Sequence, residues 1–495
     1  MKILVANLPG VKITEDGRPR HFVKAGSRWP MTIGFSKTVD YYPFPFMLAY
    51  ASALLKRETP AEVKGLDGVV RDMTADDFFR AVKDENPDLI ICELNFLTLK
   101  DDLELLKKIK TEIGSKICVG GYYPTAFGRE CLRDNGFIDF VLTGEYEFTD
   151  LELVNALLKE GPEDLSSIYG LSFRKDNQII ENKRRELLDD LDKLPYPDRE
   201  DFPAELYFDF TFFAPCISIL SSRGCPCGCT FCQERHILFN SPQYRMRRAE
   251  SVVDEMEFCI KNFKAKQFYF DDQSFTVNKK HVLAICDEII KRNIKIPWTC
   301  MADAIFIDYE MLKKMKEAGC LGIKFGVESA DDEILKQINK PLKLEKALQV
   351  VRWCKELNIK THATFCLGLP GETEETIKKS MLFMEKLKAD TSQVSKNIPY
   401  PGTPMFEWIK ERGYLKTEDL SCFDGTEETV VDYPQLRAER LDYWYKIFAR
   451  QVGRQKFLRY LKEPRQSFSI LSLIAKKKGV LGALRAAITF ASRST

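Results

Sequence analysis

The chain has 495 residues, of which 44% are hydrophobic and 12% aromatic, so it is long enough for two or three packed domains. Its formal net charge of +1 excludes a general electrostatic attraction to nucleic acid. Most of the 15 cysteines stand singly in apolar or helical stretches, which favours reduced thiols over a disulfide framework. The first residues lack the features of a signal peptide, and we expect a cytoplasmic protein.

Up to about residue 165, short apolar runs alternate with helical patterns. This alternation predicts a doubly wound α/β domain with a parallel, Rossmann-like sheet. The expected elements are strand 2–7, helix 46–56, strand 63–66, helix 74–83, strand 88–94, helix 102–112, strand 116–120 and strand 140–143.

Polar residues and glycines follow three of these strands. Parallel sheets bind ligands beyond the carboxyl ends of their strands, and paired glycines let a flat ligand approach the backbone. The candidate ligand-binding residues are Leu94, Asn95, Thr98, Gly120, Gly121, Tyr122, Gly144 and Glu145.

The order of these features, with the Pro-rich helix entry at 42–46, resembles a cobalamin-binding domain. A nucleotide-binding Rossmann domain is the alternative, although no G-x-G-x-x-G follows the first strand. Many cobalamin domains carry D-x-H-x-x-G, whose histidine coordinates cobalt from below, whereas residues 67–71 here read DGVVR. The resemblance therefore implies cobalamin held without a histidine lower axial ligand.

A second α/β region follows a hairpin pattern at 166–181 and a Pro-punctuated linker at 191–198. Six expected strands alternate there with helices, which predicts an open partial (β/α)6 barrel with its chemistry at the carboxyl ends of the strands. The expected strands are 217–220, 267–270, 298–301, 322–326, 361–366 and 393–398.

The first barrel strand leads into residues 225–232, CPCGCTFC, where Cys225, Cys229 and Cys232 have the spacing C-x3-C-x2-C. Three thiolates can hold a [4Fe-4S] cluster and leave one iron open for a small molecule. A structural zinc site is the alternative, but zinc normally has four ligands at other spacings. Cys227 is interpreted as a bystander or as a sulfur that faces the cluster loop.

This motif, with the strand ends behind it, resembles the radical S-adenosylmethionine (SAM) superfamily, and the resemblance covers about residues 1–410. It implies that SAM binds the open iron and is cleaved to a 5′-deoxyadenosyl radical, with an electron donor such as flavodoxin or ferredoxin. The residues that it places at SAM are Asp271, Asp272, Glu328, Gly368 and Pro370.

Alternatives stay open at several of these positions. Glu328 is either a SAM contact or the cap of the next helix, and the glycines are either ligand contacts or turn residues. Arg245 and Arg247 either contact SAM or phosphates or lie in a solvated helix entry.

After Tyr414 the barrel pattern stops, and residues 435–461 predict a helical cap near the mouth of the barrel. Residues 468–490 predict a basic amphipathic helix, which either docks on the protein body or makes peripheral contact with an anionic membrane. Charges interrupt it too often for it to span a bilayer.

The sequence thus predicts four regions: a cobalamin-binding domain (1–165), a linker with a hairpin (166–210), a radical SAM barrel (211–414) and a helical C-terminal cap (415–495). The resemblance implies a methyltransferase that acts on an unactivated carbon of a small molecule or lipid, with methylcobalamin as methyl donor. One alternative is a cyclase or rearrangement enzyme of the anaerobic porphyrin type. The other is a non-catalytic cobalamin or iron–sulfur sensor.

Overall fold

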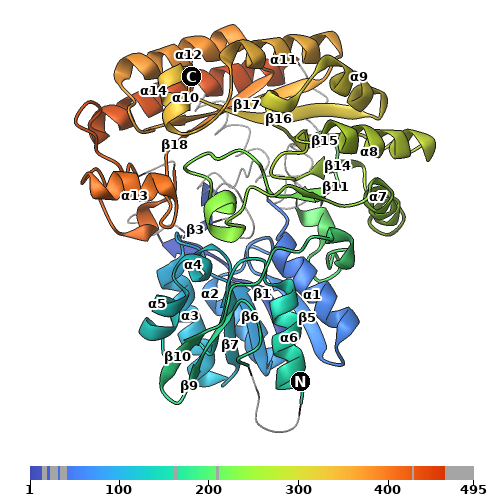
Figure 1. Cartoon of the computed structure of the whole chain (residues 1–495), viewed down its shortest axis with the longest axis vertical. Helices are drawn as coiled ribbons and strands as arrows, with labels where there is room; N and C mark the ends of the chain where they lie inside the picture. The colour runs from blue at the N-terminus through green and yellow to red at the C-terminus, as the bar shows by residue number, and fades with distance from the viewer. Residues whose placement is uncertain are drawn as a thin grey trace.

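The computed structural model describes residues 1–13, 19–22, 32–33, 42–159, 165–207, 211–425 and 428–462. Within these ranges two large sheets stand one above the other, each with its own helices (Figure 1). The helix predicted at 468–490 lies outside the described residues. No helix in the described ranges is long and apolar enough to cross a membrane.

The first sheet has the strand order β10-β9-β8-β7-β6-β1-β5, and its parallel strands confirm the predicted doubly wound domain. Five of these strands are parallel, and they stand side by side as β5, β1, β6, β7 and β8. Numbered by their order along the chain, this is 2-1-3-4-5. The direction of winding therefore reverses between β1 and β6, where such sheets bind ligands. The five strands are β1 (Lys2–Asn7), β5 (Glu62–Asp67), β6 (Leu89–Glu93), β7 (Lys116–Gly120) and β8 (Phe140–Leu142).

Helices cover both faces of this sheet, because its strands are apolar on both sides; β6, for example, is buried along its whole length. One face packs against α1 (Phe46–Glu58) and α6 (Glu147–Leu157). The other packs against α2 (Ala75–Glu85), α3 (Leu99–Glu112) and α5 (Gly128–Asp134).

The predicted hairpin forms as β9 (Leu171–Lys175) and β10 (Gln178–Glu181), but it does not stand in a separate linker. It extends the first sheet, because β9 pairs antiparallel with β8. Leu171 and Phe173 are buried in the core under α1 and α6. Burial of these two apolar side chains stabilises the hairpin in the sheet. Upstream, β2 (Val11–Ile13), β3 (Pro19–Phe22) and β4 (Thr32–Ile33) form a small antiparallel sheet that the sequence analysis did not foresee.

The second sheet has six parallel strands in chain order and is open between its edge strands β11 and β18, as expected for a partial barrel. Apolar residues of each strand pack outward against the surrounding helices. The strands are β11 (Cys216–Ile219), β14 (Gln267–Phe270), β15 (Trp298–Met301), β16 (Cys320–Glu328), β17 (Lys360–Leu367) and β18 (Thr391–Lys396). The helices are α7 (Ala249–Phe263), α8 (Lys279–Lys291), α9 (Tyr309–Glu317), α10 (Asp332–Gln337), α11 (Leu344–Glu356), α12 (Glu374–Leu387) and α13 (Pro404–Glu411).

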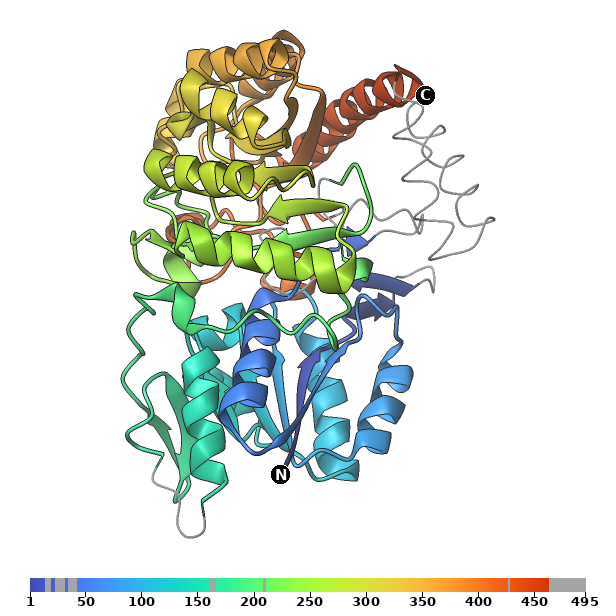
Figure 2. The same cartoon turned by 90° about the vertical axis from the view of Figure 1, so that its right-hand side faces the viewer.

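The last described helix, α14 (Ala438–Lys462), is red in Figures 1 and 2 and lies along β18 and α12. The Lys396 ammonium at the end of β18 donates a 2.7 Å hydrogen bond to Asp442, and the rings of Phe365 and Phe448 meet at 5.5 Å. The helix therefore forms part of the outer layer of the barrel, while the segment before it reaches the carboxyl end of β17.

Candidate functional site

The cysteine loop begins directly after β11, at the carboxyl edge of the barrel. Its first residues form β12 (Ser222–Arg223), which pairs antiparallel with β13 (Arg245–Met246). Gly224 follows with a φ of 93°, and a Cβ on it would collide with the carbonyl oxygen of Gln243. Only glycine fits this approach of two backbones, so the turn into the cysteines is fixed by packing.

The three predicted ligands, Cys225, Cys229 and Cys232, lie on this loop as free thiols. Across the part of the chain that the structure describes, no group of three or more His, Cys, Asp or Glu side chains has a metal-binding arrangement. The donor set itself fits a cluster, because thiolates are the ligands that iron–sulfur clusters prefer. Burial raises the pKa of Cys229 to about 12, so cluster binding would have to displace its proton.

Cys227 lies in the same loop and contacts the first predicted ligand. A hydrogen bond between the Cys227 and Cys225 side chains lowers the pKa of the Cys225 thiol. The structure thus gives Cys227 a partner within the loop, while its role as a bystander stays a prediction.

The end of β14 holds the loop from one side. The backbone N–H and the hydroxyl of Ser221 donate to Asp272 at 3.1 and 2.8 Å, and the Ser222 hydroxyl donates to the same oxygen. Gln273 accepts a 3.0 Å hydrogen bond from the Gly224 N–H. Asp272 is fully buried in this role, which the sequence analysis did not foresee. Contact of Asp271 and Asp272 with SAM stays a prediction.

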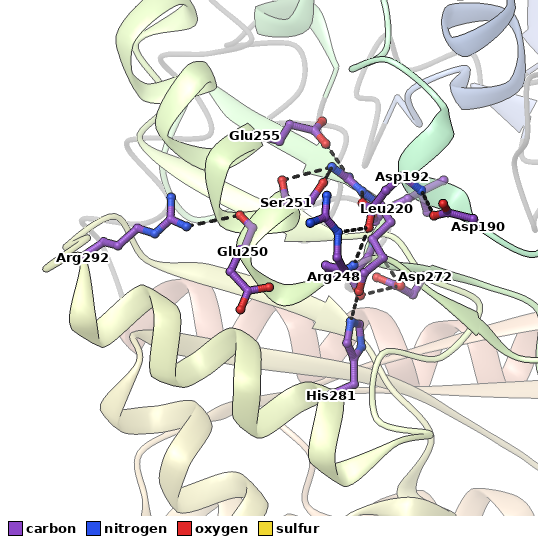
Figure 3. A network of polar contacts seen from close by, with 12 residues as sticks. Asp190, Asp192, Leu220, Arg248, Glu250, Ser251, Glu255, Asp272, His281 and Arg292 are labelled. Atoms are coloured by element: carbon purple, nitrogen blue, oxygen red, sulfur yellow. Dashed lines mark hydrogen bonds and ion pairs between the residues drawn. The ribbon is translucent and has the colours of Figure 1, made fainter.

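A second buried network holds the strand that leads into the loop (Figure 3). Arg247 donates to the Leu220 carbonyl at 2.9 Å and pairs with Glu255, which also accepts a 2.7 Å bond from Arg199. His281 contacts the Arg247 carbonyl at 2.9 Å. Burial alone would raise the pKa of Glu255, but the charges of Arg247 and Arg199 hold it below its ordinary value. The solvated helix entry considered for Arg247 is wrong, since the residue is 7% exposed.

A third group of charges lies beside the loop at the end of β16. Lys340 is buried, and its ammonium lies 3.7 Å from Glu328 and 3.6 Å from Asp303. The neighbouring Asn339 donates a 3.0 Å hydrogen bond to the Gly228 carbonyl, within the cysteine loop. These carboxylates raise the pKa of Lys340 against the effect of burial, so it stays charged.

Glu328 has a left-handed backbone conformation, which is uncommon for a residue other than glycine. Its φ is +65°, next to a register shift in the β16–β17 pairing, and burial raises its pKa. Such strain in a non-glycine residue is concentrated at functional sites. The capping alternative for Glu328 is wrong, because Asp331 caps α10 by accepting from the N–H groups of Glu333 and Ile334. Glu328 thus lies beside the buried Lys340, and its contact with SAM stays a prediction.

The sequence analysis missed Lys340 and Asp303. Asp303 comes two residues after the end of β15, so a search of every strand end would have found it. Lys340 lies in the loop after α10, and its sequence context carries no comparable signal.

The predicted SAM residues Gly368 and Pro370 follow β17. The Gly368 carbonyl accepts from the Tyr433 hydroxyl at 3.0 Å and from the Asn397 amide at 3.1 Å. Its φ is +81°, and a Cβ would meet Leu441 of α14 at 2.7 Å. Packing of the C-terminal segment therefore accounts for this glycine by itself, and SAM contact at Gly368 and Pro370 stays a prediction.

The strand ends of the first sheet face the barrel. The predicted cobalamin residues there are all buried (Leu94, Asn95, Thr98, Gly120, Gly121, Tyr122, Gly144 and Glu145). The protein's own side chains fill the space beside the paired glycines, since a Cβ on Gly120 would meet Tyr146 and one on Gly121 would meet Glu93. Cobalamin contact at these residues stays a prediction.

An apolar cluster joins the two sheets at this edge. It combines Phe96 and Tyr122 from the first sheet with Tyr400, which follows β18. The π-helical turn η3 (Glu234–Leu238), directly after the cysteines, contributes Ile237 and Leu238. The cysteine loop is therefore packed against the strand ends that are expected to bind cobalamin.

Residues 67–71, which replace the histidine motif, form a closed turn. Asp67 accepts from the N–H groups of Val69 and Val70 at 2.8 and 2.9 Å. Its other oxygen accepts from Asn7 at 3.0 Å and Tyr207 at 2.8 Å. Both valines are buried, so residues 67–71 form an aspartate-capped apolar turn, and cobalamin without a histidine lower ligand stays a prediction.

Glu145 holds the two sheets together through ion pairs. It accepts from Arg223 at 3.0 Å, from Arg245 at 2.6 Å and from the Leu188 N–H at 3.0 Å. Arg223 also donates to Glu147 at 2.6 Å. The two arginines hold the pKa of Glu145 below its ordinary value against the effect of burial. The solvated position considered for Arg245 is therefore wrong as well.

Comparison with known proteins places this arrangement in a family. Residues 219–384 match the family described as the radical SAM superfamily. A protein of Pyrococcus horikoshii named uncharacterized methyltransferase PH0819 is 30% identical over 399 residues, which are 80% of this chain and 85% of that protein. The anaerobic magnesium-protoporphyrin IX monomethyl ester cyclase of Rubrivivax gelatinosus is 24% identical over 425 residues, 84% of this chain and 75% of the cyclase.

The fold has a counterpart among solved structures. The cobalamin-dependent S-adenosylmethionine radical enzyme OxsB, with aqua-cobalamin and S-adenosylmethionine bound, aligns with a TM-score of 0.70 at 17% identity. The alignment covers 100% of this chain and 75% of OxsB. The chain therefore belongs to the radical SAM superfamily of enzymes and, within it, to the methyltransferase-like family whose barrel follows a domain of the cobalamin-binding type.

Proposed function

We propose that this protein is a cobalamin-dependent radical SAM methyltransferase that adds a methyl group to an unactivated carbon of a small molecule. The observation that carries this proposal is the packing of the cysteine loop against the strand ends of a doubly wound sheet. A radical generated at the loop and a methyl donor held by that sheet would then meet at one substrate, and such positioning is what an enzyme contributes to cofactor chemistry.

Three groups of residues are assigned to the three cofactors in this proposal. Cys225, Cys229 and Cys232 would hold a [4Fe-4S] cluster, Asp271, Asp272, Glu328, Gly368 and Pro370 would line the SAM site, and the strand ends of the first sheet would hold cobalamin. When bound, the cluster and SAM supply a 5′-deoxyadenosyl radical, and cobalamin supplies the methyl group. The closed turn at 67–71 supports cobalamin without a histidine lower ligand.

The chain's own charges give the SAM site its polarity. Lys340 stays positive next to the carboxylates of Asp303 and Glu328. SAM carries a carboxylate, an ammonium group and ribose hydroxyls, and this cluster offers a donor for the first and acceptors for the others. Lys340 and Asp303 therefore join the predicted SAM site.

The reaction also needs an electron donor, and we propose a flavodoxin or ferredoxin. A lipid is proposed as substrate only if residues 464–495 bring the protein to a membrane. Liposome flotation of the full-length chain against a truncation after Glu463 tests this. Equal flotation of both would remove the lipid proposal.

Reconstitution of two matched variants tests the proposed chemistry. The full-length chain would be reconstituted anaerobically with iron, sulfide and hydroxocobalamin, then reduced in the presence of SAM. We expect 5′-deoxyadenosine and S-adenosylhomocysteine from the unmodified chain and from Cys227→Ala, and loss of deoxyadenosine in Cys229→Ala. Loss in both variants would mean that Cys227 is also needed, and undiminished deoxyadenosine from Cys229→Ala would contradict the cluster assignment.

A radical SAM cyclase or rearrangement enzyme is the second candidate, because a cyclase is among the relatives. It would release deoxyadenosine without S-adenosylhomocysteine, and its product would carry no additional carbon. A cofactor-binding sensor would release neither compound.

A further inference from the structure

A group of four buried charges, which we call the clasp, joins the first sheet to the β12–β13 pair: Arg223, Arg245, Glu145 and Glu147. Arg223 reaches Glu145 with one guanidinium nitrogen and Glu147 with the other, at 3.0 and 2.6 Å. Arg245 reaches the second oxygen of Glu145 at 2.6 Å. Two cations and two anions thus balance in a region that is no more than 6% exposed.

The clasp is connected directly to the cysteine loop. Arg223 and Arg245 are Cα partners in the β12–β13 pair, and Arg223 stands two residues before Cys225. Gly224 lies between Arg223 and Cys225 in a turn that has no room for a Cβ, so a shift of Arg223 would be passed on to the first predicted cluster ligand.

The acidic half of the clasp is equally well connected to the first sheet. Glu145 follows β8 in the loop that contains Gly144, and Glu147 is the first residue of α6. Aromatic rings complete the enclosure, since the Arg223 guanidinium lies 5.2 Å from the ring of Tyr50 on α1 and that of Arg245 lies 5.2 Å from Phe239. Rings and carboxylates together fix the planar guanidinium groups in one orientation.

We propose that Arg223, Arg245, Glu145 and Glu147 are positioning residues that fix the cysteine loop to the strand ends of the first sheet, so that the cluster and the methyl donor keep one relative geometry. The clasp itself is a property of the chain, while its role in catalysis rests on the proposed function. A buried guanidinium with fewer anions than it needs becomes an uncompensated charge, so loss of one carboxylate should release the loop.

Two carboxylates on one helix provide the variant and its control. Glu147→Gln keeps the shape of the side chain but leaves two arginines to share the single charge of Glu145. Asp150→Asn makes the same chemical change one turn further along α6, at a fully buried carboxyl whose pKa burial raises far above its usual range, so it removes no charge.

Hydrogen exchange of the cofactor-free, full-length chain measures the coupling without any catalysis. In peptides that cover residues 219–228, we expect amide exchange at least about tenfold faster in Glu147→Gln than in the unmodified chain and in Asp150→Asn. Arg223→Lys, which keeps the charge but loses the two-pronged contact, should act in the same direction. Equal amide exchange rates in this loop in all four proteins would contradict the proposal that the clasp holds the loop.

The reconstituted protein tests the catalytic role. If the clasp sets the geometry, Glu147→Gln should lower S-adenosylhomocysteine output relative to 5′-deoxyadenosine by about tenfold or more, because misplacement by about 1 Å is enough for such losses. It should also alter the electron paramagnetic resonance spectrum of the reduced cluster. An unchanged ratio and spectrum with faster loop exchange would reject the positioning role. If the unmodified chain forms no deoxyadenosine, the proposed function is wrong. The hydrogen-exchange result would then still test whether the clasp holds the cysteine loop.

Discussion

At the scale of single residues, the barrel contains two buried carboxyls of opposite character, Glu255 in α7 and Glu372 after β17. Glu255 lies between two arginines and stays ionised, whereas Glu372, fully buried after β17, has a pKa raised to about 8 by burial. One Glu372 oxygen accepts from the Gly368 N–H, and the other has no hydrogen-bond partner. Glu372 is therefore protonated in the folded protein at neutral pH.

The raised pKa of Glu372 makes the folded chain less stable as the pH rises. Between the unfolded pKa of 4.5 and the folded pKa of about 8, the folded state binds the proton more tightly, so stability falls as the pH rises through this window. We expect Glu372→Gln, which is neutral at every pH, to lose less of its melting temperature than the unmodified chain between pH 5 and pH 8. The measurement is thermal unfolding of the cofactor-free proteins, and parallel pH profiles would contradict the assignment.

At the scale of elements, the turn between β12 and the cysteines depends on one glycine. A Cβ on Gly224 has no room against the Gln243 carbonyl, and the φ of 93° is strained for any other residue. We expect Gly224→Ala to hold much less iron after reconstitution, because the turn must rearrange. Gly136→Ala is the matched control, since a Cβ there meets nothing within 4 Å. Iron per chain is the measurement, and full loading of Gly224→Ala would show that the turn can shift at no cost.

The same scale shows what the sequence could predict. All eleven strands expected in the two sheets formed, because each is a short apolar run between turn residues, and the helices between them formed as well. The hairpin was predicted, but its place in the first sheet was not. The pairing of β9 with β8 leaves no pattern in the local sequence. The cysteine spacing was readable as a motif. The contacts that Asp272 makes with Ser221, Arg247 with Leu220 and Glu145 with Arg223 were not, since these partners lie 51, 27 and 78 residues apart in sequence.

At the scale of the whole molecule, the junction between the sheets combines an apolar cluster with buried charges. Linker residues add to it, since Arg199 pairs with Glu255 of α7 and Tyr207 donates to Asp67 of the first sheet. Segments from both sheets and from the connection between them thus share one buried region. Burial shields these pairs from dissolved ions, which screen exposed charges far more strongly.

The junction should therefore make the two sheets unfold together, and salt should have little effect on this. We expect one calorimetric transition for the cofactor-free chain, unchanged when salt is raised to about 0.5 M, where the Debye length is well below 10 Å. In Glu147→Gln, two buried arginines would share the single charge of Glu145, and this imbalance should cost about 3 to 5 kcal/mol and split the transition in two. Removal of the exposed pair between Arg440 and Glu374 by Arg440→Gln is the control, because solvent screens such pairs and they contribute little to stability. A single transition in Glu147→Gln at the unmodified temperature would mean that the two sheets stay joined without the Arg223–Glu147 pair.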